Sequence, residues 1–360
     1  MLRAAALIVG GGPAGSAAAI GLARSGIEAE LVERTEGPHD IVCGGFLGWD
    51  ALAALERLGL DPAALGARPI RRLRLISAKR CLEVPLPRLA AGLSRRALDE
   101  ALLSAAGEAG AKVARGRAVR AADLAARSVR LDDEEEIAAE ALILATGKHE
   151  LRGAGRPVDI SSRSLGLRTS LDSSPALADA LDGVIELHLF DGGYAGLLMQ
   201  EDGAANLCLS ASRGRLKGAG GVEALVAKLA DALPEVSSRL VQGAASAWSA
   251  VSGVPYGWRA GATVDGVYRV GDQAAVIASL AGDGIAIALE SGAAAARAIA
   301  GGIAARDFQR QWARRARRPV GLAEVLRRSA EHALPRDAIM GLLGWFPSLA
   351  PLAARLTRIG

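Results

Sequence analysis

A glycine-rich turn close to the N-terminus limits what this chain can fold into more than any other segment. The apolar residues 7–9 lead directly into Gly10-Gly11-Gly12-Pro13-Ala14-Gly15, and small residues continue to about Ser25. Gly10, Gly12 and Gly15 fit the pattern G-x-G-x-x-G. In that pattern the first glycine allows a sharp turn, the second lets backbone approach a pyrophosphate, and the third lets a helix pack close to a strand. The segment therefore predicts a strand, a turn and a helix that bind a dinucleotide.

An acidic residue stands where such a site needs one. A second apolar run, Ala29 to Val32, ends at Glu33, 18 residues after Gly15. A carboxylate at this position can accept hydrogen bonds from the hydroxyls of an adenosine ribose. The pyrophosphate would lie against Pro13 and Ala14 at the start of the helix, where free N–H groups and the helix dipole favour anions. The alternative is an Ala/Gly-rich turn that only packs a strand against a helix.

Composition narrows the class of protein. The chain has 360 residues, of which 51% are apolar, which is typical of a globular protein with about two domains. No apolar run reaches the roughly 18 residues of a membrane-spanning helix, and Gly10–Gly12 interrupt the first apolar run as no signal peptide would. We therefore expect a cytoplasmic protein. The three cysteines, Cys43, Cys81 and Cys208, are too widely spaced to indicate a metal site, and we expect the last two in the core.

The order of predicted elements indicates that one domain is left and later re-entered. A helix and a strand are expected within 94–115, a hairpin loop at 132–136, and a buried parallel strand at 142–145. Between 165 and 211, and again at 244–254, β-like runs alternate with turn signals, as in an antiparallel sheet. A strand at 267–270 and a long Ala-rich helix from about Gly284 to Gly301 then restore the α/β pattern.

These elements predict an α/β fold with a Rossmann-like dinucleotide-binding domain, an inserted antiparallel β-sheet substrate domain and a C-terminal helical segment. The expected boundaries are 1–68 with 94–160 and 255–305 for the first domain, 69–93 with 161–254 for the second, and 306–360 for the helices.

The C-terminal segment has its own composition. From Arg306 onward it holds eleven arginines against four acidic residues, a net charge of +7 in a chain whose total is +4. It also carries apolar bulk, namely Leu342, Leu343, Trp345, Phe346, Leu349 and Leu352. One interpretation is peripheral contact with an anionic membrane or a lipid-like substrate. The other is a terminal helical pair that packs on the sheet with a solvated arginine face. Nucleic acid is not expected as a partner because aromatic residues are scarce.

Six segments, taken in order, resemble the FAD-dependent oxidoreductases that include para-hydroxybenzoate hydroxylase and geranylgeranyl reductase. The first is the glycine-rich turn with Glu33, and the second is Cys43-Gly44-Gly45, which is similar to the C-G-G segment of geranylgeranyl reductases. The others are Ser94–Asp99 (R-x-x-L-D), Ala145-Thr146-Gly147 (A-T-G), Val270–Ala275 (V-G-D-x-A-A) and Gly282–Ile285 (G-x-G-I).

The resemblance implies FAD as the cofactor and assigns residues to it. Arg95 would contact the phosphate region, and Val119 would offer its backbone to the adenine. Asp272 would accept hydrogen bonds from ribityl hydroxyls while the adjoining backbone meets phosphate. The helix beginning near Gly284 would aim its positive end at the flavin, favouring the reduced form. The full set implied is Gly10, Gly12, Pro13, Ala14, Gly15, Glu33, Arg34, Cys43, Gly44, Gly45, Arg95, Val119, Thr146, Gly147, Gly271, Asp272, Gly282, Asp283, Gly284 and Ile285.

Plainer structural roles compete with several of these assignments. Asp272 could be a helix cap, and Arg95 could be a surface arginine in a first helical turn. Cys43 either tunes the flavin or donates a proton, or it only fills a glycine-rich turn. Tyr194 either points into a cavity and hydrogen-bonds a substrate, or it is a half-buried strand aromatic. We expect His188 to be a polar surface residue of its strand.

The leading functional prediction is an FAD-dependent monooxygenase that hydroxylates an aromatic, phenolic or polyketide-like hydrophobic molecule, with Cys43 and Tyr194 as catalytic candidates. No second G-x-G-x-x-G occurs, so NAD(P)H would bind only transiently as electron donor. The alternative is a double-bond reductase of the geranylgeranyl reductase type acting on an isoprenoid or other lipid. Against it, residues 193–199 lack the Trp and Phe-Pro of the reductase pattern G-Y-x-W-x-F-P. A third class is a flavin-binding or lipid-carrier protein without turnover.

Overall fold

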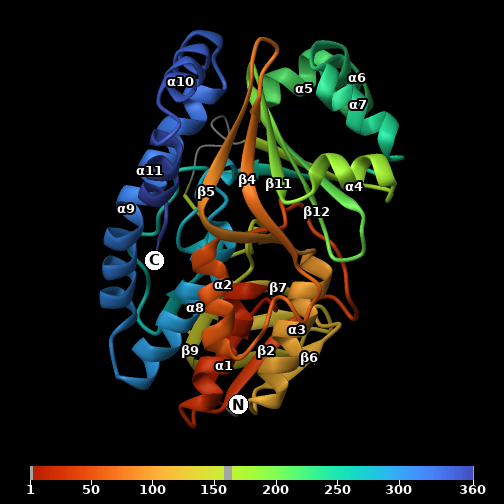
Figure 1. Ribbon diagram of the computed structural model, residues 1–360. Helices are drawn as coiled ribbons and strands as arrows, with labels where there is room; N and C mark the ends of the chain where they lie inside the picture. Colours follow the sequence, from red (N-terminus) through yellow and green to blue (C-terminus); the bar gives the residue numbers. More distant parts are fainter. Residues whose placement is uncertain (1–2, 158–163, 360) are drawn as a thin grey trace.

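The computed structural model describes residues 3–157 and 164–359. They form two β-sheets, and the chain passes from one sheet to the other more than once (Figure 1). The first sheet has the strand order β6-β2-β1-β9-β8-β7, with β15 paired to β9. Its parallel centre is β6, β2, β1, β9 and β15, and β7 and β8 join it as an antiparallel edge. The strands are β1 (Arg3–Val9), β2 (Ala29–Glu33), β6 (Lys112–Arg115), β7 (Val119–Asp123), β8 (Ser128–Leu131), β9 (Glu136–Leu144) and β15 (Val267–Arg269).

Small residues let three helices cover one face of this sheet. The helices are α1 (Pro13–Arg24), α3 (Arg95–Glu108) and α8 (Gly284–Ala300). A Cβ atom on Gly292 of α8 would lie 2.0 Å from the carbonyl oxygen of Ala14, and one on Gly21 would lie 2.6 Å from the Cβ of Ala296. Because neither distance is sterically allowed, the absence of a side chain is what permits α1 and α8 to pack this closely.

The second sheet is larger and mostly antiparallel. Its order is β14-β10-β13-β12-β11-β4-β5-β3, and within it β11 and β4 run parallel. The strands are β3 (Phe46–Leu47), β4 (Arg68–Ile76), β5 (Cys81–Gly92), β10 (Ser164–Leu171), β11 (Val184–Phe190), β12 (Gly193–Met199), β13 (Ala205–Ala211) and β14 (Ser249–Val254). The α/β fold with an inserted antiparallel sheet and a helical C-terminus is confirmed. The division at 160/161 lies outside the described residues, and the domain boundaries stay a prediction.

The two faces of the second sheet have different covers (Figure 1). One face packs against α4 (Pro175–Leu181), α6 (Val222–Ala232) and α7 (Pro234–Gln242) through a leucine-rich core, and the short α5 (Arg213–Ala219) precedes α6. The opposite face carries Leu75, Leu187 and Leu189, which gather with Ala330 and Met340 of the C-terminal helices. Alternation along β11 therefore sends Leu187 and Leu189 to one side and Glu186 and His188 to the other.

The C-terminal helices tie the two sheets together. α9 (Ala305–Ala330) packs Phe308, Trp312 and Val320 into the core beneath the first sheet, and α10 (Ala333–Trp345) and α11 (Leu349–Leu356) follow it. The remaining elements are α2 (Trp49–Leu58) and the short 3-10 helices η2 (Gly271–Gln273) and η3 (Ser279–Ala281). No helix within the described ranges is long and apolar enough to cross a membrane.

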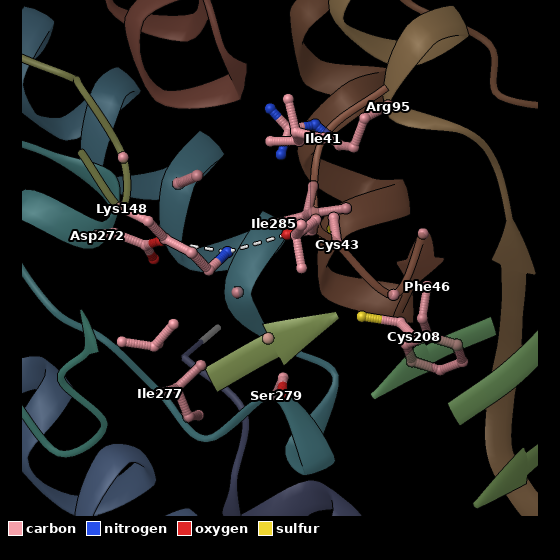
Figure 2. Close-up of a pocket in the computed structure, with 18 of the residues that line it drawn as sticks. Ile41, Cys43, Phe46, Arg95, Lys148, Cys208, Asp272, Ile277, Ser279 and Ile285 are labelled. Atoms are coloured by element: carbon pink, nitrogen blue, oxygen red, sulfur yellow. Dashed lines mark hydrogen bonds and ion pairs between the residues drawn. The ribbon is translucent and has the colours of Figure 1, made fainter. Parts of the chain in front are cut away.

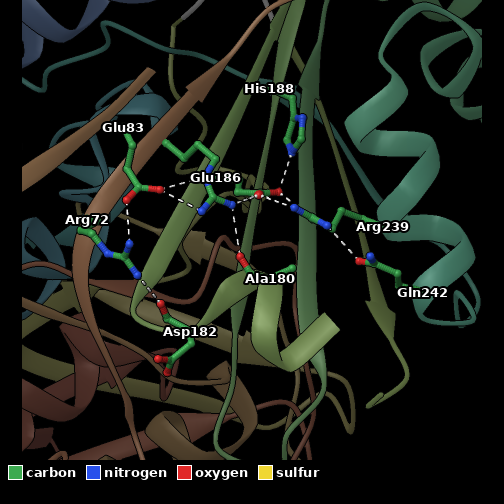
Figure 3. Close-up of polar contacts among 9 residues, drawn as sticks. Arg72, Glu83, Ala180, Asp182, Glu186, His188, Arg239 and Gln242 are labelled. Carbon is green, nitrogen blue, oxygen red and sulfur yellow. Dashed lines mark hydrogen bonds and ion pairs between the residues drawn. The ribbon is translucent and has the colours of Figure 1, made fainter. Parts of the chain in front are cut away.

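Two expectations about side-chain position are wrong. We expected His188 at the surface, but it is fully buried. Its Nε2 lies 3.1 Å from the equally buried Glu186 carboxylate, which gives the imidazole a polar partner (Figure 3). Arg74 and Arg239, from strand and helix segments far away in sequence, supply the charges that make this burial tolerable. Cys81 is exposed and not in the core, since it begins β5 directly after the hairpin turn.

Candidate functional site

The glycine-rich turn is shaped by contacts that no side chain would allow. Gly10 has φ of +106°, and a Cβ atom there would lie 2.6 Å from the carbonyl oxygen of Ala145. A Cβ on Gly15 would lie 1.9 Å from the carbonyl oxygen of Gly10. The turn thus brings β1, α1 and the end of β9 into direct backbone contact, and Gly12, Pro13 and Ala14 at the N-terminus of α1 line a cavity.

Glu33 is held as an acceptor beside this turn. One carboxylate oxygen accepts the Gly11 N–H at 2.7 Å, and the other accepts the N–H and hydroxyl of Thr35 at 2.9 and 2.8 Å. Burial raises the pKa of Glu33, but the hydrogen bonds from Gly11 and Thr35 more than offset it and leave the pKa below its ordinary value. The ionised carboxylate fits the ribose-binding role that remains predicted for it.

Arg95 is not the surface arginine considered as an alternative. Its side chain is almost fully buried in the first turn of α3, with Nε and Nη2 donating to the Asp99 carboxylate at 2.8 and 2.6 Å. Its Nη2 lies 3.2 Å from where a Cβ on Gly12 would stand. A buried cation therefore lies directly over the turn where a cofactor phosphate is expected.

One cavity of about 990 Å³ connects these groups with the second sheet and the C-terminal helices. Its wall brings together nearly every residue singled out from the sequence, namely Gly10, Gly12, Pro13, Ala14, Glu33, Arg34, Cys43, Gly44, Gly45, Arg95, Val119, Thr146, Gly147, Tyr194, Gly271, Asp272, Gly282, Gly284 and Ile285. Gly15 lies behind the wall, as its packing role requires. These assignments to the cofactor stay predictions.

Asp283 requires a correction. It is fully buried, and its carboxylate accepts hydrogen bonds from Nη1 of Arg358 at 3.0 Å and the N–H of Ile359 at 2.8 Å. Its side chain anchors the C-terminal end of the chain at the start of α8, and Asp283 does not belong to the cavity wall that its neighbours Gly282 and Gly284 line. Burial raises its pKa to about 6, although Arg358 and the Ile359 N–H act in the opposite direction.

The Cys43-Gly44-Gly45 turn is held against the cavity by the second sheet (Figure 2). The buried Asn206 donates its Nδ2–H to the carbonyl oxygen of Cys43 at 3.0 Å, and Gly45 adopts φ of +68°. Arg168 in turn donates to the Asn206 side chain at 2.7 Å and pairs with Asp40 at 3.0 Å. The half-buried Cys43 is therefore a positioned cavity residue, which sequence reasoning left open.

Lys148 is a site residue that the sequence reasoning missed. Its ammonium lies 3.6 Å from Asp272 and 3.4 Å from the carbonyl oxygen of Val42, across the cavity (Figure 2). Burial lowers its pKa, but the Asp272 carboxylate more than compensates, so the pKa is raised and the side chain stays charged. In the sequence, its position directly after the Ala145–Gly147 turn could have indicated that Lys148 lies at the cofactor site. Cys208 also lines the cavity, and burial raises its pKa to about 12, so it stays a neutral thiol.

A cluster of hydroxyl groups provides polar contacts on the wall of the larger part of the cavity, which is mainly apolar. The Tyr194 hydroxyl lies 2.5 Å from Ser279 Oγ and accepts the Leu280 N–H at 3.0 Å, and the Tyr256 hydroxyl lies 2.8 Å from Ser279 Oγ. The Tyr256 hydroxyl also donates to Ser210 Oγ at 3.4 Å. Burial raises the pKa of Tyr194 well above its ordinary value, so it keeps its proton. No sequence pattern singled out Ser279 or Tyr256.

We call the part of the cavity beyond this cluster the chamber. Its wall comes from β4, β11 and β12 on one side and from α9 and α10 on the other, with Leu75, Leu187, Leu189, Ala330, Arg336 and Met340 facing it. Apart from the hydroxyl cluster and Arg336, these side chains are apolar. The chamber thus suits a hydrophobic small molecule held beside Gly282 and Gly284.

The geometry fits FAD. A Cβ atom on Gly12 would take up space beside the Arg95 guanidinium, and the α1 N-terminus, Arg95 and Lys148 all line the cavity where phosphates would lie. The family model of an FAD binding domain matches residues 3–164. A curated relative, the menaquinone reductase of Mycolicibacterium smegmatis (strain ATCC 700084 / mc(2)155), is 30% identical over 339 residues, covering 86% of this chain and 79% of that protein.

This chain belongs to the FAD-dependent oxidoreductases of the para-hydroxybenzoate hydroxylase and geranylgeranyl reductase superfamily. Solved structures share the fold of this FAD-dependent oxidoreductase at low identity. The flavin-dependent brominase Bmp2 superposes with a TM-score of 0.81 at 16% identity, covering 99% of this chain and 93% of that one. PqsL of P. aeruginosa, in complex with 2-aminobenzoylacetate, superposes with a TM-score of 0.72 at 20% identity, covering 94% and 100%. Bound FAD would supply the redox chemistry, and the residues of the glycine-rich turn, Glu33 and Arg95 would supply its position and electrostatic environment.

Proposed function

We propose that this oxidoreductase is a monooxygenase that hydroxylates an aromatic, phenolic or polyketide-like hydrophobic molecule with NAD(P)H and O2. The observation that carries the proposal is the hydroxyl cluster of Tyr194, Ser279 and Tyr256 on the wall of an otherwise apolar chamber. In the overall reaction one atom of O2 is inserted into a ring C–H bond and forms a hydroxyl group. The other oxygen atom is reduced to water by the hydride of NAD(P)H and one proton.

A phenol is a good match for this wall. Tyr194 keeps its proton, and the Leu280 N–H fixes the position of its oxygen. Ser279 and Tyr256 are hydroxyls that can each donate or accept, so together they can accept a hydrogen bond from a phenolic substrate. A phenol that donates a hydrogen bond has a more electron-rich ring, which favours attack by an electrophilic oxygen. The chain thus orients the ring and holds the proton of the phenolic oxygen in a hydrogen bond.

The neighbouring backbone supports the same arrangement. Gly282 has φ of +69°, and α8 begins at Gly284 with its N-terminus toward the cavity. Fixed N–H dipoles at this point favour negative charge on a reduced flavin. The leucines of β4 and β11 and the C-terminal helices cover the chamber and limit the access of water to it.

Double-bond reduction is the second candidate, because the curated relative at 30% identity is a menaquinone reductase. In this chain Cys43 lines the cavity and would be the proton donor to a carbon of an isoprenoid double bond. Gly196 and Leu198, which also line the cavity, stand where the reductase pattern has Trp and Phe. That difference favours hydroxylation.

A peripheral membrane contact through the C-terminal helices would deliver such substrates. Leu334 and Trp345 of α10 are 86% and 83% exposed, and Phe346 follows them. The exposed Arg355 of α11 adds positive charge to the C-terminal helices, which anionic lipids attract. The wild type should co-sediment with anionic phosphatidylglycerol vesicles and bind little to neutral vesicles. The Trp345→Ser, Phe346→Ser double variant should bind the anionic vesicles less, and its weak binding to neutral vesicles should not change.

The decisive experiment is mass spectrometry of products from the FAD-loaded enzyme with NADPH under isotopically labelled dioxygen. The two probes are a long-chain alkylphenol and a polyprenyl naphthoquinone. Incorporation of one labelled oxygen into the alkylphenol, lost in Tyr194→Phe but largely kept in Cys43→Ala, is the expected result. Gain of two hydrogens by the naphthoquinone, lost in Cys43→Ala, would replace hydroxylation by reduction. Oxidation of NADPH with neither product would refute both.

A further inference from the structure

Arg336 places a positive charge inside the apolar chamber. It lies on α10, is only 9% exposed, and lines the cavity beside Leu189, Ala330 and Met340. A guanidinium among leucine and methionine side chains loses most of its hydration, and this cost must be offset by hydrogen bonds or by a counter-charge. The partners of Arg336 therefore show how much of this desolvation cost is offset.

The described partners of Arg336 leave its bonding incomplete. Its Nη1 donates to an Asp191 carboxylate oxygen at 2.9 Å and to the Ala330 carbonyl oxygen at 3.3 Å. Its Nε–H is buried and finds no acceptor among the residues that the structure describes. The Asp191 side chain is 61% exposed, so water screens the one carboxylate that pairs with this arginine among the described residues. A buried donor of this kind is costly unless a further acceptor reaches it.

The local backbone favours a negative charge at the same place. α10 begins at Ala333, so Arg336 lies in its first turns, where the free N–H groups and the helix dipole are positive. Arg80 approaches the same helix at Gly341, and Lys79 pairs with Asp337 on it. Lys79, Arg80 and Arg336 thus place positive charge at α10, and the acidic residues Asp191 and Asp337 there already have basic partners, as does Glu331 just before the helix.

We infer that Arg336 is an oxyanion-binding subsite of the chamber, and that the substrate is a hydrophobic molecule carrying a carboxylate. The carboxylate would accept from Nη2 of Arg336, which has no partner among the described residues, while the apolar body lies along Leu187, Leu189 and Met340. The inference deepens the proposed function and rests on it only in taking the chamber as the substrate site. It holds equally for hydroxylation and for reduction.

Isothermal titration calorimetry on the FAD-loaded protein tests this with decanoate and methyl decanoate as probes. The two differ in charge and little in apolar length. We expect the wild type to bind decanoate at least about tenfold tighter than the ester, as one charge-assisted hydrogen bond would give. Arg336→Met should abolish this preference and leave ester binding unchanged, and Arg336→Lys should retain part of it. Arg328→Met, which changes an exposed arginine of α9, is the matched control.

Asp191→Asn separates a binding subsite from a structural clamp. If Arg336 only fastens the Asp191 turn to α10, Asp191→Asn and Arg336→Met should lower decanoate binding alike, and the inference is wrong. If Arg336 binds the carboxylate, Asp191→Asn should keep or strengthen decanoate binding. Absence of a decanoate preference in the wild type would also overturn it. Binding is measured without turnover, so failure to detect hydroxylated product refutes the proposed function and leaves the subsite unaffected.

Discussion

Replacing Glu186 by Gln tests how the second sheet carries a buried charge. Glu186 is fully buried on β11, on the face opposite to Leu187 and Leu189, and Figure 3 shows the polar groups around it. Its Oε1 accepts from Arg74 at 2.7 Å and from Arg239 at 2.9 Å, and its Oε2 accepts from His188 at 3.1 Å. Arg74 is shared with the partly exposed Glu83, and Arg239 belongs to α7. The carboxylate thus fastens α7 to the sheet.

The magnitude follows from the pKa of this carboxyl group. Burial raises the pKa of Glu186, but hydrogen bonds from His188 and Arg239 outweigh burial and hold it at about 2, against an ordinary 4.5. This difference corresponds to about 3 kcal/mol of stability. Because the folded-state pKa is depressed, that stability is present above pH 4.5 and is lost as the pH falls toward 2. Gln keeps the shape but leaves Arg74 and Arg239 with less counter-charge, so we expect a loss of about 3 kcal/mol at pH 7.

Urea unfolding of the FAD-loaded protein, followed by circular dichroism, measures this loss. The difference between wild type and Glu186→Gln should narrow by about 1 kcal/mol between pH 7 and pH 3.5, since the unfolded wild type takes up a proton in that range. Glu83→Gln, on the same arginine but partly exposed, should cost less than about 1 kcal/mol. A loss below about 1 kcal/mol for Glu186→Gln, or a difference independent of pH, would refute the reasoning.

Three further predictions concern the cofactor site and its support. Gly15→Ala should abolish FAD binding in a fluorescence titration, because its Cβ would lie 1.9 Å from the Gly10 carbonyl oxygen, whereas Gly107→Ala on the open face of α3 should bind normally. Arg95→Met should raise the Kd for FAD at least about tenfold by removing a charge-assisted hydrogen bond, and the exposed neighbour Arg96→Met should not. Asp283 has a folded-state pKa of about 6, above its ordinary 3.8, so it binds a proton more readily in the folded protein and adds about 2 kcal/mol of stability as the pH falls from 7 to 4. Asp283→Asn should lose that gain in thermal unfolding, and equal pH profiles for the two proteins would contradict the assignment.

The parts of the fold predicted from the sequence are those that local geometry dictates. Gly10 and Gly15 are required by backbone contacts within a few residues of one another or with the end of β9, so their spacing alone indicated the dinucleotide turn. The alternation of apolar runs and turn signals likewise indicated the inserted sheet, because each strand and turn is specified by its own residues.

The misjudged residues depend on partners distant in sequence. His188 is buried because Glu186 next to it is neutralised by Arg74 and Arg239, which no local pattern connects. Asp283 follows a family motif, yet its carboxylate is taken by Arg358 at the returning C-terminus. Tertiary contacts of this kind override the most probable role of a residue type.

The same distinction explains why the cofactor is clearer than the reaction. The FAD half of the cavity is shaped by backbone, which a glycine pattern reports. The chamber is shaped by side chains from β4, β11, β12, α9 and α10, and their combination has no linear signature. Tyr194 and Ser279, for example, are 85 residues apart and meet only in the folded chain. Substrate choice is therefore decided by contacts that a sequence pattern does not contain.

Gly196 offers a direct test of that view. It lines the cavity on β12, and a Cβ there would meet Leu187 Cδ2 at 3.5 Å and the Cys208 carbonyl oxygen at 3.9 Å. Both are ordinary contact distances, so a larger side chain would extend along the cavity wall without disturbing the sheet. A Trp, as in the reductase pattern, would occupy chamber space with one of the largest apolar side chains. Gly196→Trp should keep FAD binding and lower kcat/KM for a bulky alkylphenol at least about tenfold through KM, since lost binding of this kind acts on the ground state and the transition state alike. Gly196→Ala should leave both parameters nearly unchanged. If the Trp variant accepts the bulky substrate as the wild type does, the space beside Tyr194 does not set substrate choice, and the missing Trp cannot explain a departure from the reductases.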